Sequence, residues 1–319
     1  MSSGQPLVSI IVPCYNAARW LPATLESALA QTWPHVEIIV VDDGSTDDSL
    51  TVARSFSGRG VRVELIPNSG AAAARNRGLA LARGDFLQFL DADDLLAPDK
   101  LEKQLARLLP AGSTAVATCA WARFRSDPAQ ACFVPEPLWQ DFAPVDWLVC
   151  SWRRHVMMAT AAWLVPRALA DRAGQWSTSF KHNPVDDMEY FSRVLLAAER
   201  VLFCGKTRIY YRSAMRGSLS QRRSDEAWRA IFASFQLTAD RFLARDNSPR
   251  TRLAVATQLQ QLVFESYPRL PAERAAAGAR VSALGGCDLR PDAGPWRRRL
   301  QSLIGWKAVK RLHDWTYQK

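Results

Sequence analysis

Residues 36–47 read VEIIVVDDGSTD, in which an apolar, β-branched run leads directly into an acidic turn. The run Val36–Val41 predicts a strand buried inside a sheet, because side chains on both of its faces are apolar. Leu7–Val12 (LVSIIV) predicts a second buried strand, ended by Pro13. Polar residues therefore follow two buried strands, at the place where ligands bind in open α/β sheets.

Helices and strands alternate on either side of this stretch. Further strands are expected at Val61–Ile66 and Asp85–Leu90, and helices at Leu21–Leu29, from Ser45 or Thr46 to Phe56, from just after Gly70 to Ala82, and at Asp99–Leu109. This alternation predicts βαβ units, and hence an α/β fold with a mainly parallel, Rossmann-like sheet covered by helices on both faces.

The pattern is looser in the second half of the chain. Strands are expected at Ala115–Phe124, Ala161–Val165 and Arg208–Arg212, helices at Asp186–Glu199 and over 225–267 with a break near Pro249, and a linker at Ala275–Pro295. We expect four segments: an N-terminal half of the α/β domain at 1–110, its second half at 111–222, a helical extension at 223–295 and a tail at 296–319.

Composition limits the class of protein. The chain has 319 residues, of which 48% are hydrophobic, enough for one large domain or a domain with an appendage. No apolar run approaches the ~20 residues of a membrane-spanning helix. The first residues, MSSGQPLVSIIVPCYN, lack the basic region of a signal peptide, and the six cysteines are scattered. We therefore expect a cytoplasmic protein with free thiols.

The formal net charge of +10 is unevenly distributed. Residues 1–110 hold 10 Lys+Arg against 13 Asp+Glu, whereas residues 296–319 hold 7 against 1. A nucleic-acid-binding protein would not be expected to have an acidic first third. We expect no nucleic-acid partner.

Carboxylates gather at two of the predicted strand ends, in Asp42-Asp43 and in Asp91-Ala92-Asp93-Asp94. Like charges at one sheet edge destabilise each other unless a cation or donors compensate them. The second group suggests a hard divalent cation, Mg²⁺ or Mn²⁺. The structural alternative is that these acidic tips cap the helices that follow them.

Common nucleotide-binding motifs are absent. No G-x-G-x-x-G follows the first predicted strand, which argues against a dinucleotide-dependent dehydrogenase. Gly205-Lys206-Thr207 is similar to the end of a P-loop, but Arg200 stands where the first glycine belongs. We interpret it as a turn between strands.

Four motifs together resemble the N-terminal signatures of family 2 glycosyltransferases with the GT-A fold. They are VSIIVPCYN at 8–16, IIVVDDGSTD at 38–47, NSGAAAARNRG at 68–78 and FLDADD at 89–94. The resemblance covers roughly residues 7–220. It implies a GT-A fold, followed here by a helical C-terminal extension, and inverting transfer of a sugar from a nucleotide diphosphate donor. Residues 1–110 would then be the nucleotide-sugar-binding half, and residues 111–222 the acceptor-binding and catalytic half.

The resemblance also implies roles for individual residues. Pro13, Tyr15 and Asp43 would line the pocket of the nucleotide base, and the Asp43 carboxylate would accept a hydrogen bond from a uracil-like ring. Arg75 would lie near the phosphates or base of the donor. Asp91 would approach the ribose or sugar, and Asp93 would hold the metal.

A later signature of the family is an acidic pair that opens a helix. Asp186 and Asp187 fit it, with Asp186 in place of the usual glutamate. The resemblance makes Asp187 the general base. The histidine that often follows a Tyr-Arg pair is missing, because Ala214 and Met215 occupy that stretch, so Arg212 or Arg216 would have to substitute for its phosphate contact.

The chemistry expected of such a site is in-line displacement. A carboxylate that accepts the proton of the acceptor hydroxyl accelerates attack by ~10²–10⁴-fold, and Asp187 is the candidate. A metal on Asp93 would neutralise the departing diphosphate. The structural alternative for Asp186 and Asp187 is an acidic cluster in the first turn of a helix, where the helix dipole favours negative charge.

We expect a metal-dependent enzyme that uses a UDP-sugar and a saccharide or lipid-linked acceptor, with Mn²⁺ or Mg²⁺ as the cofactor, in bacterial cell-surface polysaccharide or glycolipid synthesis. A sugar-nucleotide nucleotidyltransferase is the alternative enzyme. A non-catalytic, membrane-docked protein that binds nucleotide sugars is the alternative outside catalysis.

Two aromatic features bear on the acceptor. Six tryptophans fall between the acidic motif and the proposed base, where they form either an acceptor wall or core: 121, 139, 147, 152, 163 and 176. The tail at 296–319 predicts a basic amphipathic helix, weakened by Gly305. It would lie on an anionic membrane surface, on the cytoplasmic face of the inner membrane, or pack on the protein itself.

Overall fold

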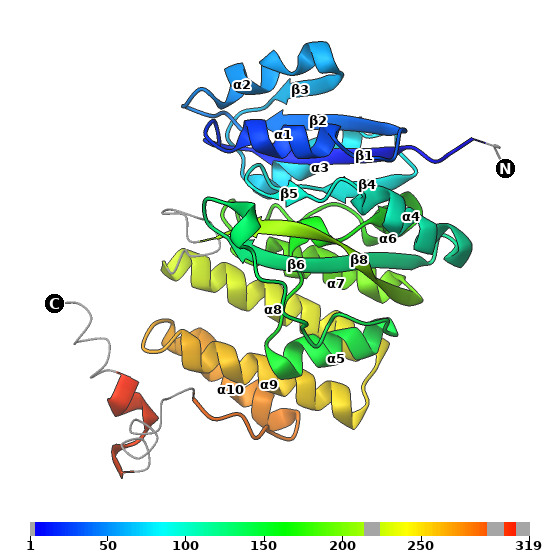
Figure 1. Cartoon of the computed structure of the whole chain (residues 1–319). Helices are drawn as coiled ribbons and strands as arrows, with labels where there is room; N and C mark the ends of the chain where they lie inside the picture. Colours follow the sequence, from blue (N-terminus) through cyan, green and yellow to red (C-terminus); the bar gives the residue numbers. More distant parts are fainter. Residues whose placement is uncertain (1–3, 214–223, 292–302, 311–319) are drawn as a thin grey trace. The chain divides into compact units, whose positions relative to one another are not determined.

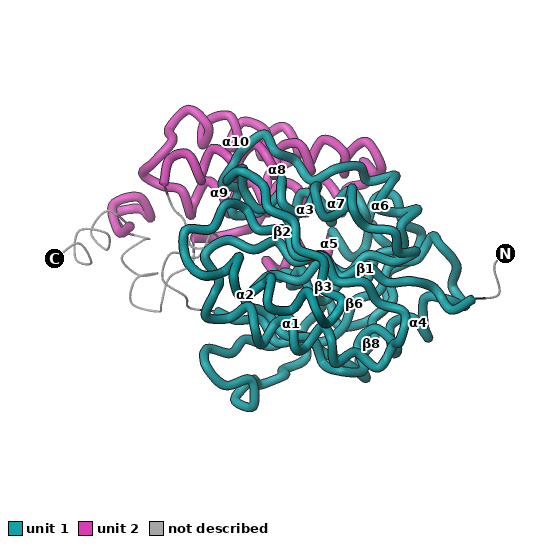
Figure 2. The backbone as a smooth tube through the Cα atoms, turned by 90° about the horizontal axis from the view of Figure 1, so that it is seen from above, with its two compact units in different colours: residues 1–148, 156–221 teal, residues 149–155, 222–319 magenta. Residues whose placement is uncertain are grey.

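The computed structural model describes residues 4–213, 224–291 and 303–310 (Figure 1). The chain divides into two compact units, residues 1–148 with 156–221 and residues 149–155 with 222–319 (Figure 2). The four-segment division expected from the sequence stays a prediction.

The first unit is built on a five-stranded sheet in the order β3-β2-β1-β4-β7. Its strands are β1 (Val8–Cys14), β2 (Val36–Asp42), β3 (Val61–Leu65), β4 (Phe86–Phe89) and β7 (Val165–Pro166). All neighbours are parallel except β7, which is antiparallel to β4. The four strands expected in the first hundred residues, and the parallel sheet, are confirmed.

Strand β1 does not end at Pro13 as expected. The strand continues to Cys14, where Pro13 lies opposite Val41 and Cys14 opposite Asp42. Proline lacks only a donor, and the ladder continues because the Cys14 carbonyl accepts a hydrogen bond from the Asp43 amide at 2.8 Å. The acidic turn after β2 is thus fixed to the end of β1.

Seven helices begin in the described part of the first unit, and the last residues of α5 belong to the second unit. They are α1 (Leu21–Leu29), α2 (Ser49–Ser55), α3 (Ala71–Leu81), α4 (Lys100–Ala111), α5 (Pro144–Arg154), α6 (Arg167–Ala173) and α7 (Asp186–Ala197), with short 3₁₀ turns η1 (Ser57–Arg59), η2 (Pro128–Gln130) and η3 (Thr160–Ala162). Helix α3 packs on β1 and β2. It approaches β1 so closely that a Cβ on Gly78 would lie 2.3 Å from Ile11 Cγ2.

Helix α2 begins later than expected, at Ser49 instead of Ser45 or Thr46. Both residues belong to the turn instead: the Ser45 amide donates to Asp42 at 2.9 Å and the Thr46 amide to Asn16 at 2.8 Å. Their backbone donors are therefore used to close the turn and are not the first donors of a helix.

A second sheet has the order β5-β8-β6, with β5 (Leu95–Leu96), β6 (Ala115–Phe124) and β8 (Arg200–Arg212). Gly205-Lys206-Thr207 lies inside β8, so its interpretation as a turn between strands was wrong. A register shift between Cys119 and Ala120 on β6 absorbs the irregularity. The strand expected at Ala161–Val165 is also wrong in the main, because η3 occupies its first half and β7 begins only at Val165.

The second unit is helical over its described residues. It contains α8 (Asp225–Arg245), α9 (Pro249–Glu265) and α10 (Pro271–Ala283), and Trp152 packs edge-on against Phe235 and Phe242 of α8. The break between α8 and α9 agrees with the expected one. The linker expected at Ala275–Pro295 is wrong over residues 275–283, which belong to α10. This helix packs on α9, its alanines favour a helix, and Pro271 suits its first turn.

Part of the C-terminal tail is described. The Trp306 ring lies 5.0 Å from that of Phe264 and 5.1 Å from that of Tyr267, and Lys310 Nζ donates to the Glu265 carbonyl at 2.8 Å. Over 303–310 the tail therefore contacts the end of α9, while Leu303 is 80% exposed. The rest of the expected amphipathic helix lies outside the described residues, as do Ala214, Met215 and Arg216. None of the helices in the described ranges has the length and apolar character needed to cross a membrane.

Candidate active site

The turn after β2 is held by backbone donors. Asp43 is 3% exposed; its Oδ1 accepts the Ser69 amide at 2.6 Å and its Oδ2 the Gly70 amide at 2.8 Å. These residues precede helix α3, so Asp43 ties the first acidic turn to the start of that helix. Gly70 has φ +96°, and a Cβ there would lie 2.2 Å from the Lys181 carbonyl oxygen, so only glycine fits.

Pro13 and Tyr15 lie at the carboxyl end of β1, as expected. Pro13 is buried, whereas Tyr15 is 48% exposed and offers an aromatic face to solvent. Whether Asp43 contacts a nucleotide base stays a prediction. Both of its oxygens already accept one backbone hydrogen bond, and each keeps capacity for a further donor.

The acidic turn after β4 has fewer donors. Asp94 is fully buried; its Oδ1 accepts the Arg212 amide at 2.8 Å, whereas its Oδ2 has no hydrogen-bond partner in the described ranges. Burial, together with Asp93 and Asp91, raises the pKa of Asp94 well above its ordinary value. Burial and the neighbouring Asp91 likewise raise the pKa of Asp93 to about 7.

Arg212 is fixed in a stack beside this turn. Its guanidinium lies 4.1 Å from the ring centroid of Trp20 and 4.3 Å from that of Phe124. Nε donates to the Asp93 carbonyl at 3.0 Å and Nη1 to the Arg125 carbonyl at 2.6 Å. Arg212 therefore supports the backbone of the acidic turn, and its contact with a donor phosphate stays a prediction.

Arg75 joins the two acidic motifs. From the buried face of α3, its Nη2 contacts Asp91 at 2.8 Å and its Nη1 contacts Asp186 at 2.7 Å. Burial opposes the charged form of Arg75, but Asp186 and Asp91 outweigh it and raise its pKa above the ordinary value. The ring centroid of Trp176 lies 4.4 Å from the same guanidinium. Arg75 therefore brings together residues 91 and 186.

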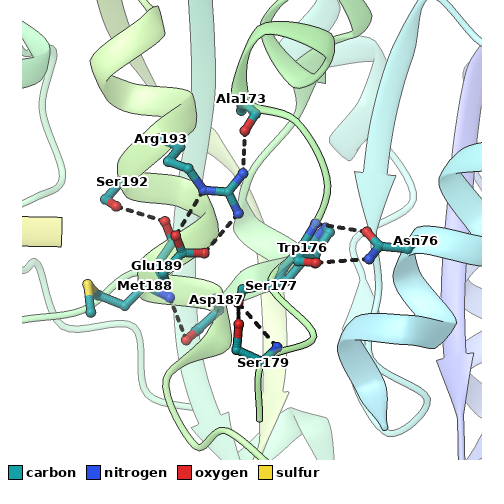
Figure 3. A network of polar contacts seen from close by, with 10 residues as sticks. All are labelled: Asn76, Ala173, Trp176, Ser177, Ser179, Asp187, Met188, Glu189, Ser192 and Arg193. Carbon is teal, nitrogen blue, oxygen red and sulfur yellow. Dashed lines mark hydrogen bonds and ion pairs between the residues drawn. The ribbon is translucent and has the colours of Figure 1, made fainter. Parts of the chain in front are cut away.

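Asp187 lies in the first turn of α7, next to this pair. Its carboxylate accepts the Met188 amide at 2.7 Å (Figure 3). The residue as a whole is half-buried. Burial and the neighbouring Asp186 raise the pKa of Asp187 to about 7. A carboxylate with this pKa can accept a proton near neutral pH, as a general base requires.

The carboxylates of Asp91 and Asp93 fit a divalent cation whose remaining ligands come from a bound substrate. In the described part of the chain, no three His, Cys, Asp or Glu side chains are arranged to hold a metal ion. Mg²⁺ commonly takes one or two carboxylates and completes its shell with substrate phosphates. Asp93, with Asp91 beside it, matches this donor set, because the raised pKa of Asp93 marks a negative charge that the protein compensates poorly.

Sequence reasoning missed several supporting residues. Asn76 follows Arg75 directly in the motif ARNRG, yet its role became visible only from its two hydrogen bonds to the Trp176 backbone. Trp20 and Phe124 had no signal in the sequence, because they reach Arg212 from separate elements. Of the six tryptophans considered for the acceptor wall, Trp121, Trp147, Trp152, Trp163 and Trp176 are buried.

The sequence of the N-terminal region is similar to known glycosyltransferases. Residues 9–130 match the sequence model of "Glycosyl transferase family 2". An uncharacterized glycosyltransferase of Haemophilus influenzae is 48% identical over 108 residues, which are 33% of this chain and 43% of that relative. A putative teichuronic acid biosynthesis glycosyltransferase of Bacillus subtilis, TuaG, is 44% identical over the same shares. The chain thus spans less than half the length of these relatives.

Solved structures agree over most of the chain. Residues 1–349 of S. aureus TarS in complex with UDP-GlcNAc give a TM-score of 0.69 at 18% identity, covering 87% of this chain and 80% of that one. The mannosyltransferase PcManGT from Pyrobaculum calidifontis, in complex with GDP-Man and Mn²⁺, gives 0.58 at 20% identity, covering 99% and 84%. These likenesses confirm the expected GT-A fold with a helical C-terminal region. The resemblance to glycosyl transferase family 2 is thus confirmed over residues 9–130.

Proposed function

We propose that this protein is a metal-dependent, inverting glycosyltransferase that moves a sugar from a UDP-sugar to a hydroxyl of a saccharide or lipid-linked acceptor. The observation that carries the proposal is the bridge of Arg75 between Asp91 and Asp186, with Asp187 next to it. The bridge connects the motif expected to hold the donor with the motif expected to activate the acceptor.

Asp187 is the general base of this proposal. Its carboxylate takes the proton of the acceptor hydroxyl while the hydroxyl oxygen attacks the anomeric carbon, and the nucleotide diphosphate leaves from the opposite face. Asp186 shares its negative charge with Arg75 at 2.7 Å, which holds it in place while its proximity raises the proton affinity of Asp187. Because the hydroxyl oxygen attacks from the side opposite the leaving diphosphate in a single displacement, the configuration of the anomeric carbon is inverted.

The donor side of the proposal rests on β1, β2 and the turn after β4. Tyr15 offers an exposed ring for a base, and Asp43 lies at the neighbouring strand end. Asp93, with Asp91, would hold the divalent cation, Mn²⁺ or Mg²⁺, which compensates the charge of the diphosphate when bound. The ligands of two structures with this fold, UDP-GlcNAc in one and GDP-Man with Mn²⁺ in the other, support this choice of donor and cofactor.

We place the reaction in bacterial cell-surface polysaccharide or glycolipid synthesis, on the cytoplasmic face of the inner membrane. The similarity to TuaG and, at 41% identity over 106 residues, to the chondroitin synthase of Pasteurella multocida supports a polysaccharide product. Exposed Leu303 next to a basic tail supports peripheral contact with an anionic surface, whereas Trp306 and Lys310 pack on α9.

The test is a panel of nucleotide sugars with Mn²⁺, in which released nucleotide diphosphate and pyrophosphate are measured separately. UDP-sugars are expected to give UDP, first by slow hydrolysis and faster with an acceptor. Pyrophosphate release from a sugar phosphate and UTP would instead favour the nucleotidyltransferase alternative. Binding of UDP without turnover of any donor would favour the non-catalytic alternative.

A further inference from the structure

Asn76 forms a two-point contact with a segment a hundred residues away. Its Nδ2 donates to the Trp176 carbonyl at 2.9 Å, and its Oδ1 accepts the Trp176 amide at 2.8 Å (Figure 3). One carboxamide thus satisfies both backbone groups of one residue, as a neighbouring strand would. An ionised carboxylate can only accept, and a hydroxyl would have to donate and accept through a single oxygen, so neither reproduces the two parallel contacts of the carboxamide.

Trp176 in turn lies between α3 and α7. Its ring is stacked on that of Tyr190, with centroids 4.1 Å apart and an interplanar angle of 7°. The guanidinium of Arg75 lies 4.4 Å from the same ring. Two groups this close cannot occupy one face of an indole, so Arg75 and Tyr190 cover opposite faces. The indole is 1% exposed.

A second contact fixes α7 to the same segment. Arg193, on α7, donates through Nη1 to the Ala173 carbonyl, and pairs through Nε and Nη2 with Glu189 at 3.0 and 2.8 Å (Figure 3). Residues 173–176 are thus held to α7 by Arg193 and to α3 by Asn76. We call this pair of contacts the 173–176 clasp.

We propose that Asn76 is a positioning residue for Asp187, acting through the 173–176 clasp. Arg75 and Asn76 are neighbours on α3, and each connects this helix to α7: Arg75 through the Asp186 carboxylate, Asn76 through the Trp176 backbone. Together they fix the first turn of α7, which carries Asp187. The proposal rests on the proposed function, since it assigns Asn76 to the acceptor half of that reaction.

The clasp makes a prediction that separates positioning from donor binding. Among the described contacts of Asn76, none is with Pro13, Tyr15 or Asp43. Loosening the clasp should therefore slow transfer and leave the affinity for UDP unchanged. A displacement of about 1 Å at a reacting group can reduce the rate by ~10²-fold.

The test compares Asn76→Asp with Arg77→Gln. Asn76→Asp keeps the acceptor for the Trp176 amide and replaces the donor to the Trp176 carbonyl by an oxygen. Arg77→Gln, the next residue on α3, breaks a surface ion pair with Glu64 of β3. For Asn76→Asp we expect kcat to fall by roughly 10- to 100-fold, with the donor KM and the UDP affinity within about threefold of wild type. The Arg77→Gln control should keep all three values.

Hydrogen exchange gives a readout that does not need a substrate. Amides of residues 174–190 should exchange faster in Asn76→Asp than in wild type, and at the wild-type rate in Arg77→Gln. Should Asn76→Asp fail to fold, Arg193→Lys loosens the other contact of the clasp and should give the same loss of kcat alone.

Unchanged kcat in the folded variant, or loss of UDP affinity in parallel with kcat, would overturn the role of Asn76. Unchanged exchange over 174–190 would overturn the clasp itself. If wild-type protein transferred no sugar from any donor, the proposed function would fail, and the exchange experiment would still decide whether Asn76 holds this segment.

Discussion

Asp43 and Asp94 are buried carboxylates in acidic turns at strand ends of the same unit, yet their surroundings differ. Each oxygen of Asp43 accepts a backbone amide, from Ser69 and Gly70. Asp94 accepts one amide, from Arg212, and its second oxygen has no partner in the described ranges.

The difference indicates two uses of the same side chain. A buried carboxylate whose two oxygens both accept backbone amides fixes the loop that donates them. A buried carboxylate with few donors destabilises the fold, and the raised pKa values of Asp93 and Asp94 express that cost. The turn after β2 is therefore held in place by its own hydrogen bonds, whereas the turn after β4 carries carboxylates that the described residues compensate poorly.

The largest effect on kcat is expected at Asp187, the proposed general base, which lies next to the Arg75–Asp91 contact of the turn after β4. Asp187→Asn should reduce kcat by ~10²–10⁴-fold, because an amide cannot accept the proton of the acceptor hydroxyl. UDP affinity should stay close to that of wild type in calorimetry. Asp171→Asn, at an exposed position on α6, is the control; equal activity of Asp187→Asn and the control would remove Asp187 from the mechanism.

The pH dependence of kcat gives the next largest effect. Asp186, Arg75 and Asp91 surround Asp187, and burial with Asp186 raises its pKa to about 7. A base acts only when deprotonated, so kcat should rise about tenfold per pH unit below 7 and level off above it. A pH profile that is flat between 5 and 8 would contradict the assignment.

Removing the negative charge of Asp43 should destabilise the fold. In Asp43→Asn only one oxygen remains, so one of the Ser69 and Gly70 amides loses its acceptor and faces an NH₂ group. A lost hydrogen bond to a charged group corresponds to about 1.5–3 kcal/mol of unfolding free energy. Urea denaturation measures this loss of unfolding free energy. An unchanged midpoint in Asp43→Asn would show that Asp43 does not stabilise its turn.

Asp94→Asn is expected to change the free energy of unfolding in the opposite direction to Asp43→Asn, and by less. The variant keeps an acceptor for the Arg212 amide and removes a buried charge whose second oxygen lacks a described partner. Without divalent cations at pH 8, the free energy of unfolding should rise by about 1 kcal/mol. Destabilisation similar to that of Asp43→Asn would show that the two turns do not differ.

The sequence predicts much of the fold because its first hundred residues repeat one local pattern. Apolar strands and polar strand ends alternate so regularly that β1 to β4 and α3 agree with expectation within a few residues. The misses have local causes. Ladder bonds continue past Pro13, side-chain acceptors draw Ser45 and Thr46 into a turn, and a register shift keeps Gly205 inside β8.

The sequence motifs predict which residues form the candidate site, but they do not predict which of these residues contact one another. The motifs name Asp91, Asp186 and Arg75, but only the fold shows that one guanidinium joins both carboxylates. Arg212 or Arg216 was expected to substitute for the phosphate contact of the missing histidine. The described contacts of the Arg212 guanidinium are with rings and carbonyls that lie far apart in the sequence. Such long-range contacts leave no periodic signal.

The contrast between the two turns is tested most directly by the coupling between Mn²⁺ and UDP. Calorimetry would measure UDP affinity with and without Mn²⁺ for wild type, Asp93→Asn and Asp43→Asn, since the ratio of the two affinities reports the coupling free energy. We predict that Mn²⁺ strengthens UDP binding in wild type and in Asp43→Asn, even where Asp43→Asn binds UDP more weakly, and that Asp93→Asn loses this strengthening. Strengthening that persists in Asp93→Asn, or disappears in Asp43→Asn, would contradict the account.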